Sequence, residues 1–226
     1  MAVSCTSQTV WTTAPTDAPS PAPPVRGREH RFQQQVQDWK AIRIQNVVMQ
    51  RFDYSCGASA LATLLRYFIG DPVTERHVLV KLLGMLNAVE MKDRVKKGFS
   101  MTDLRRVAVK MGYLSTIGRL EFDKLRESKV PLIVGLIVNE YDHFVVYRGM
   151  DDRYVYLADP SRGNIRTPIP EFVKQWQKNA ILVVIKKGQK PSTTSPLQVR
   201  PEEFALGKQN RLYLRDRIAT KVIPPR

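Results

Sequence analysis

The apolar residues of this chain change their spacing partway along the sequence, and this change limits the folds that the chain can adopt. Between residues 56 and 112 they recur every three or four positions, which is the spacing of helices buried on one side. From residue 132 to residue 187 they form short runs dense in Val, Ile and aromatic residues, which are typical of strands. Helices first and an antiparallel sheet second predict an α+β fold with a cleft between the two halves.

Turn and capping residues set the expected limits of the individual elements. Gly70 ends a first helix, Thr74 caps a second, and Ser100 caps a third that Gly112 stops. Residues 92–98 are predicted to form a basic loop. Two shorter helices are expected at 121–127 and 170–176, and strands at 42–48, 113–117, 132–138, 143–150, 154–158 and 180–185.

Cys56 is one of two cysteines and stands at the start of the first expected helix. It is followed by Gly57 and then by small and apolar residues at helical spacing. The unpaired amides and the positive end of the dipole at a helix N-terminus favour an anion, so they favour the nucleophilic thiolate. On this stretch alone, a buried structural cysteine is an equally good interpretation.

Three further residues favour a reactive cysteine. Gln50 lies shortly before Cys56, where its amide would point at an oxyanion that forms beside the sulfur. His143 stands at the head of one apolar run and Asp159 follows another in a turn, so both lie at strand ends. A nucleophile, a base and an orienting carboxylate therefore occur in the order Cys, His, Asp.

These residues and their neighbours resemble the bacteriocin-processing cysteine peptidases, also called double-glycine leader peptidases, which have a papain-like fold. The agreement in order, spacing and flanking residues makes the match specific. Members of that family more often have Asp before the Cys-Gly pair, where this chain has Ser55. The resemblance covers residues 45–187, and its motifs are Gln50, Cys56-Gly57, His143-Phe144-Val145-Val146 and Asp159-Pro160.

The resemblance implies a cysteine peptidase in which Cys56 attacks a peptide carbonyl, His143 protonates the leaving amine and Asp159 orients the imidazole. The side chain of Gln50 would stabilise the oxyanion. The resemblance also implies cleavage after Gly-Gly in a leader peptide or secreted substrate, without a cofactor or a metal. The chain looks like a stand-alone member without transporter domains. Some such members accompany secretion systems for extracellular fibres such as functional amyloid.

Two other functions stay open at this stage. Degenerate relatives that lack the nucleophile serve as docking modules for leader peptides, although this chain keeps Cys56, His143 and Asp159. The same three residues would also serve a papain-like amidase or transglutaminase, which acts on a different acyl donor. The expected partners are a peptide or protein with a Gly-Gly-type site and components of a secretion system.

The chain is strongly basic. Its 226 residues include 36 Lys and Arg against 21 Asp and Glu, which gives a formal net charge of +15. This charge favours an acidic partner, but the basic residues are scattered. They form no stripe interleaved with aromatic residues, and the sequence has no zinc pattern or phosphate loop, so no nucleic acid is expected. No apolar run is long enough for a transmembrane helix.

Composition divides the chain into three parts. Residues 1–28 are rich in Pro, Ala, Ser and Thr and are expected to be disordered or extended. Residues 29–187 are expected to form the peptidase domain, and residues 188–226 a basic extension with a linker and an amphipathic patch. No signal peptide is recognisable. A Pro-rich segment nevertheless suits the tether of an envelope protein, so the periplasm or cell envelope of a bacterium is expected, with the cytoplasm as the alternative.

Overall fold

The computed structural model describes residues 24–26, 31–33, 39–138, 141–189, 192, 194–200 and 203. The chain divides into two compact units, residues 1–42 and 43–226. In the first unit, β1 (Pro24–Arg26) pairs antiparallel with β2 (Arg31–Gln33). The segment 1–28, expected to be disordered or extended, thus contributes β1. Its other residues lie outside the described part of the chain.

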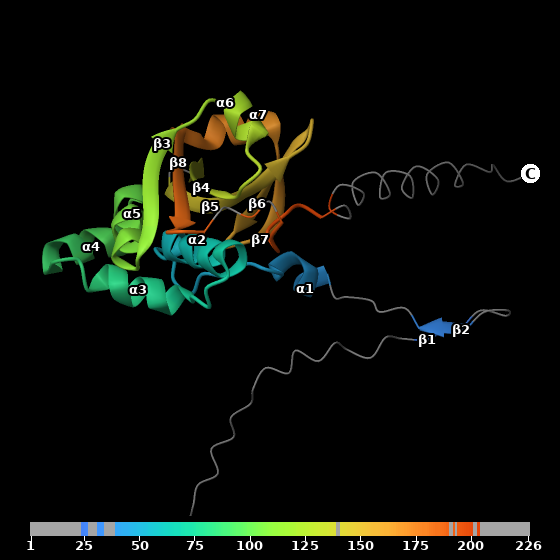
Figure 1. The fold of residues 1–226 in the computed structure, drawn as a ribbon, viewed down its shortest axis with the longest axis horizontal. Coiled ribbons are helices and arrows are strands. Elements are labelled where there is room, and N and C mark those ends of the chain that lie inside the picture. Colours follow the sequence, from blue (N-terminus) through green and yellow to red (C-terminus); the bar gives the residue numbers. More distant parts are fainter. Residues whose placement is uncertain are drawn as a thin grey trace, which may run out of the picture. The chain divides into compact units, whose positions relative to one another are not determined.

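The second unit is built on a six-stranded sheet in which neighbouring strands are antiparallel. The strand order is β3-β8-β4-β5-β6-β7, so β4 to β7 form a meander and the last strand returns between β3 and β4 (Figure 1). This sheet follows a series of helices along the chain, which confirms the predicted α+β class. The strands are β3 (Tyr113–Arg119), β4 (Leu132–Val138), β5 (Tyr141–Met150), β6 (Tyr154–Asp159), β7 (Gly163–Pro168) and β8 (Trp176–Lys186).

Helices cover this sheet, and α3, α4 and α5 gather on the side of α2, away from α6 and α7 (Figure 1). No helix in the described part of the chain combines the length and apolarity needed to cross a membrane. The helices are α1 (Trp39–Ile44), α2 (Cys56–Leu64) with its π-helical continuation η1 (Leu65–Ile69), α3 (Glu75–Leu83), α4 (Ala88–Lys97), α5 (Met101–Lys110), α6 (Phe122–Glu127) and α7 (Ile169–Gln175).

Both faces of the sheet are buried, which explains why its central strands are apolar at consecutive positions. On β5, Phe144 and Val146 belong to the core cluster that contains residues of α2, α3 and α5. Val145 and Tyr147 belong to a second cluster, which contains residues of α6 and α7. Alternate side chains of one strand therefore join two separate cores.

Small residues at the start of α2 let this helix lie close against β5. Every residue of α2 is buried. A Cβ added at Gly57 would lie 3.0 Å from Cδ1 of Leu104 and 3.2 Å from Cδ2 of Phe144. Because Phe144 follows His143 in β5, the missing side chain at position 57 sets how closely the helix that begins with Cys56 approaches the strand that carries His143.

Gly57→Ala should therefore lower the free energy of unfolding by about 1–3 kcal/mol, because overpacking of a filled core outweighs the better helix propensity of Ala, worth about 1 kcal/mol. Chemical denaturation measures the difference. Gly118→Ala is the matched control, since a Cβ there would meet Ile181 at an ordinary 3.7 Å. A Gly57→Ala protein as stable as the wild type would show that this contact does not limit the approach of α2.

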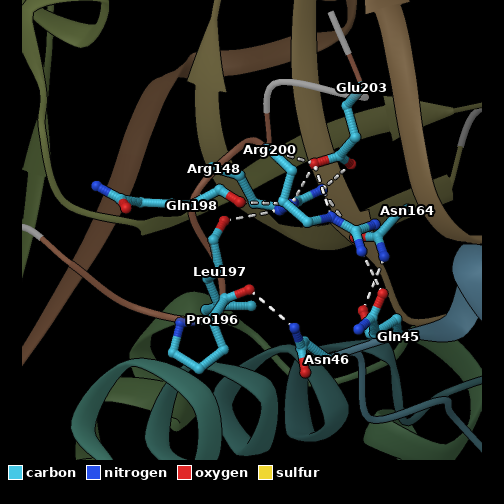
Figure 2. A network of polar contacts seen from close by, with 9 residues as sticks. All are labelled: Gln45, Asn46, Arg148, Asn164, Pro196, Leu197, Gln198, Arg200 and Glu203. Carbon is cyan, nitrogen blue, oxygen red and sulfur yellow. Dashed lines mark hydrogen bonds and ion pairs between the residues drawn. The ribbon is translucent and has the colours of Figure 1, made fainter. Parts of the chain in front are cut away.

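Residues 194–200 and Glu203 return to the domain after the sheet, and we call them the C-terminal strap (Figure 2). Arg148 on β5 holds the strap: its side chain is 3% exposed and its guanidinium donates to both carboxylate oxygens of Glu203, at 2.7 and 2.8 Å. It also donates to the carbonyl oxygens of Leu197 and Gln198 at 2.8 and 2.9 Å. Leu197 is itself buried in the core.

The extension 188–226 thus contains residues that pack on the domain. Its predicted amphipathic patch lies outside the described residues. The members of that patch are Phe204, Leu206, Leu212, Leu214 and Ile218.

Two of the predicted elements are wrong. Most of residues 92–98, expected as a basic loop, belong to α4, which Asn87 caps and in which no side chain is buried. Residues 92–98 are mostly Lys, Arg and Asp, and such a run of charges is as typical of a solvated loop as of the exposed face of a helix. Residues 42–48, expected as a strand, contain the end of α1, a turn at Asn46 with φ 59°, and the buried Val47. The apolar residues there reflect burial of a connection rather than a strand.

Candidate active site

Cys56 is the first residue of α2 and lines a cleft of about 610 Å³. The residue is 4% exposed. Ser55, which precedes the helix as its N-cap, does not bond the helix amides through its hydroxyl. The positive end of the helix dipole therefore lies at Cys56 without a capping side chain from Ser55, and this environment favours an anionic sulfur.

His143 and Asp159 lie on adjoining strands. In the antiparallel register of β5 and β6, Val146 is opposite Ala158, which places the side chains of His143 and Asp159 on the same face. Nε2 of His143 is 2.9 Å from Oδ1 of Asp159. Because Nε2 is engaged in this bond, Nδ1 is the ring nitrogen left for Cys56, the other partner of the imidazole.

A turn after β6 fixes the buried carboxylate of Asp159. Oδ1 accepts from the amide and the hydroxyl of Ser161 at 2.8 and 2.7 Å, and Oδ2 accepts from Nε of Arg162 at 2.8 Å. Burial alone would raise the pKa of Asp159, but the hydrogen bonds from His143, Ser161 and Arg162 hold this pKa well below its usual range. Asp159 is therefore an anion that stabilises a charged imidazole.

The imidazole of His143 is itself positively charged at neutral pH. Burial alone would lower its pKa, but the hydrogen bonds and charges of Asp159 and Cys56 raise the pKa of His143 from 6.5 to about 9. The ring therefore keeps its proton below pH 9 and loses it as the pH rises through that value. A carboxylate, an imidazolium and a sulfur in this order form the arrangement that activates a cysteine nucleophile.

Alkylation of Cys56 by iodoacetamide at pH 7 should consequently be at least severalfold faster in the wild type than in His143→Ala, because the charged imidazole beside the sulfur favours the thiolate, which is the form that reacts. Mass spectrometry of timed samples in a Cys5→Ser background gives both rates on a single thiol. Equal rates in the two proteins would contradict the pairing.

Gln50, the predicted oxyanion donor, lies in the segment before Cys56. Its backbone amide donates to the carbonyl of Pro160 at 2.9 Å, which ties this segment to the turn after Asp159. Its Nε2 donates to the carbonyl of Phe52 at 3.1 Å, and its buried Oε1 has no hydrogen-bond partner among the described residues. The side chain does not line the cleft, so its role at the oxyanion stays a prediction.

The cleft also contains residues that the sequence did not single out. They come from the loop before α2, from the end of α4 and from both ends of the β4–β5 connection. The proximity of Tyr54 to Cys56 in the sequence was a usable signal, whereas α4 gave none because it was expected to be a loop. The additional lining residues include Tyr54, Lys96, Gly98, Val138, Tyr141 and Arg162.

In the described part of the chain, His, Cys, Asp and Glu side chains form no group of three or more that could hold a metal ion.

Comparison with known proteins shows where this chain belongs. The model of the Peptidase C39 family matches residues 44–188. The chain is 36% identical over 178 residues to the probable functional amyloid protease FapD of Pseudomonas aeruginosa, an alignment that covers 79% of this chain and 75% of that protein. It is 34% identical over 146 residues to the protein of the same name from Pseudomonas fluorescens, covering 65% of this chain and 63% of that one.

A solved structure shares the fold of this chain. The crystal structure of the peptidase domain of Streptococcus ComA, a bi-functional ABC transporter involved in a quorum sensing pathway, matches with a TM-score of 0.53 and 17% identity. The match covers 62% of this chain and 98% of that domain. It confirms the predicted papain-like fold, and the family match spans well over half of the 226 residues. The chain therefore belongs to the peptidase C39 family.

Proposed function

We propose that this protein is a cysteine endopeptidase that cleaves a peptide bond after Gly-Gly in a leader peptide or secreted substrate. The observation that carries the proposal is the cleft in which Cys56, at the N-terminus of α2, meets an imidazole whose pKa is raised to about 9. The buried Asp159 holds that imidazole through Nε2. In this proposal Cys56 is the nucleophile, His143 is the acid, and the buried Asp159 is the anion that orients the imidazole.

The reaction follows from the protonation states. The sulfur of Cys56 attacks the peptide carbonyl, and the oxygen of that carbonyl takes the negative charge. The imidazolium of His143 then gives its proton to the nitrogen of the leaving amine as the C–N bond breaks, which leaves a thioester on Cys56. Water attacks this thioester while the neutral imidazole takes a proton from it. The acid product leaves, and the charged sulfur and imidazolium are restored.

The preference for glycine is supported by the walls of the cleft. Cys56 is almost fully buried, so the backbone of a substrate must approach it closely. Tyr54 on one wall is held by ring contacts with Phe52 and Phe99, at centroid distances of 5.5 and 6.1 Å. Tyr141 also lines the cleft. A Gly-Gly pair brings no side chains beside these aromatic groups, whereas larger residues would have to fit beside them.

A role in the secretion of extracellular fibres is the second part of the proposal. It is supported by the likeness to the Pseudomonas proteins named as probable functional amyloid proteases. Such a role requires the protein to meet its substrate in the cell envelope, so we propose the periplasm or envelope as its location. Fractionation of the native bacterium with an antibody against the protein tests this, and recovery in the cytosolic fraction alone would contradict it.

The test of the activity is cleavage of defined peptides by the purified protein under reducing conditions. One peptide contains an internal Gly-Gly pair, and two matched peptides have Gly-Ala or Ala-Ala at the same place. We expect mass spectrometry to find a cut after Gly-Gly in the first peptide and slower or no cleavage in the others. Cys56→Ala provides the inactive control.

The alternatives make different predictions in the same assay. A docking module would bind the Gly-Gly peptide without cutting it. A transglutaminase would join an added amine to a glutamine side chain, and an amidase would release ammonia with the peptide backbone intact. Any of these three results in place of backbone cleavage would overturn the endopeptidase proposal.

A further inference from the structure

We propose that Glu75 is a positioning residue for the nucleophile: it fixes both ends of the loop of residues 51–55, which joins Gln50 to Cys56. Glu75 is the first residue of α3 and is 4% exposed. It belongs neither to the predicted catalytic set nor to the lining of the cleft. The consequence for turnover rests on the proposed function, whereas the consequence for the thiol does not.

Two hydrogen bonds carry this inference. Oε1 of Glu75 accepts from the backbone amide of Arg51 at 2.9 Å and lies 2.5 Å from the hydroxyl oxygen of Ser55. Arg51 directly follows Gln50, and Ser55 directly precedes Cys56. One carboxylate oxygen therefore holds the first and the last residue of the loop.

The interior of the loop is organised around the carbonyl oxygen of Phe52. The amide of Ser55 donates to it at 3.1 Å, the hydroxyl of Ser55 lies 2.7 Å from it, and Nε2 of Gln50 donates to it at 3.1 Å. Ser55 thus connects Glu75 to the side chain of Gln50 as well as to Cys56. Displacement of Ser55 would therefore move both Gln50, the predicted oxyanion donor, and Cys56, the predicted nucleophile.

The hydroxyl of Ser55 does not bond in the way that is usual for a serine at a helix N-cap. A serine at a helix N-cap ordinarily accepts from an amide of the first helical turn. Here the hydroxyl makes no such bond and contacts Glu75 instead. The contact leaves the first turn of α2 without a cap from Ser55, next to the sulfur that benefits from its dipole.

Burial of Glu75 also needs an explanation, because a carboxylate away from water is costly unless it is hydrogen-bonded. None of the ion pairs in the described part of the chain includes Glu75. Its position at the start of α3 supplies a favourable helix dipole, and the loop supplies the two donors. The hydrogen bonds from the loop therefore offset the cost of burying the carboxylate of Glu75, and the carboxylate in turn holds the loop.

The experiment compares Glu75→Ala, Glu75→Gln and Ser55→Ala in a Cys5→Ser background. The first readout is the rate of iodoacetamide alkylation of Cys56 at pH 7, well below the unfolding temperature, and it needs no substrate. The second is kcat and KM for the Gly-Gly peptide. We expect Glu75→Ala and Ser55→Ala to slow alkylation severalfold and to lower kcat about 10- to 100-fold, with KM within about twofold, since displacement of reacting groups affects chemistry more than binding.

Conservative and matched variants separate positioning from stability. Glu75→Gln keeps an oxygen that accepts from both donors, so its alkylation rate and kcat should stay within about threefold of the wild type. Asp71→Asn is the matched control: Asp71 accepts from Tyr113 at 2.8 Å and Lys186 at 2.6 Å, away from the loop. It should lower stability without slowing alkylation.

The double variant Glu75→Ala with Ser55→Ala gives a further check. Its alkylation rate and kcat should be close to those of either single variant, because both substitutions remove the same link.

Several results would overturn the inference. One is a Ser55→Ala protein whose alkylation rate and kcat equal those of the wild type, a result that can be obtained even if Glu75→Ala does not fold. Another is a Glu75→Gln protein in which both rates are as low as in Glu75→Ala. A wild-type protein that alkylates rapidly but cuts no Gly-Gly peptide would instead contradict the proposed function alone, since the alkylation rates of the variants still test Glu75.

Discussion

Cys56→Ala and His143→Ala should each lower kcat for peptide cleavage by at least about 10⁴-fold, because nucleophile and acid act as one unit. The pair of substitutions together should be little slower than either alone, since the first already breaks the unit. Product formation followed by mass spectrometry with enzyme in excess over the Gly-Gly peptide measures these rates. Binding of the peptide should survive in all three variants.

Milder variants and a second cysteine make this test specific. Asp159→Asn should be less damaging than His143→Ala, because an amide keeps an acceptor for Nε2 of the imidazole while losing the charge behind it. Gln50→Ala should slow the chemical step by about a hundredfold if its amide reaches the oxyanion. Cys5→Ser should leave turnover unchanged. Cleavage that persists in Cys56→Ala would remove the basis for the nucleophile.

Glu203→Ala should lower the free energy of unfolding by about 3–5 kcal/mol, which is the usual cost of leaving one member of a buried ion pair without its partner. The side chain of Arg148 is 3% exposed and its guanidinium is bonded to both oxygens of Glu203. Without that carboxylate, the acceptors left for the buried charge among the described residues are carbonyl and amide oxygens. Denaturant titration monitored by tryptophan fluorescence measures the loss.

Two matched variants show whether that loss of stability comes from leaving the charge of Arg148 buried without its partner. Arg148→Met combined with Glu203→Leu should be less destabilising than Glu203→Ala, because apolar residues of similar volume leave no charge uncompensated. Glu127→Ala removes the exposed partner of Lys124, and it should change the free energy of unfolding by less than about 1 kcal/mol. Equal losses for Glu203→Ala and Glu127→Ala would mean that the strap contributes no more than a surface ion pair.

Much of the sheet could be predicted from the sequence because both of its faces are covered. Strand β4 has the predicted limits, 132–138, and β6 differs from its prediction by one residue, since apolar residues fill consecutive positions in both. Strand β7 was not predicted. Its sequence, GNIRTP, is poor in apolar residues, and it forms because the edge of β6 is open to the chain after the turn at residues 160–162. Local composition could not have indicated that pairing.

Some residues of the candidate site could likewise be predicted from the sequence, and others could not. Cys56, His143 and Asp159 could be proposed because each stands at the end of an element that the sequence predicts, and the structure places Nε2 of His143 2.9 Å from Asp159. Their catalytic roles and that of Gln50 stay predictions. Glu75 could not have been found this way, since its contact with Ser55 joins two segments that are separate in the sequence and have no shared pattern.

The strap has a consequence for exchanging this domain between proteins. The region shared with the family ends at residue 188, but Leu197 and Glu203, which complete the surroundings of Arg148, lie beyond it. Asn46, near the other limit of that region, donates to the carbonyl of Pro196 in the strap. The unit to transplant is therefore longer than the region that the family model matches. A chimaera that receives only residues 44–188 would lack the contacts of Leu197 and Glu203 with Arg148, so it should be less stable than one that also receives the strap.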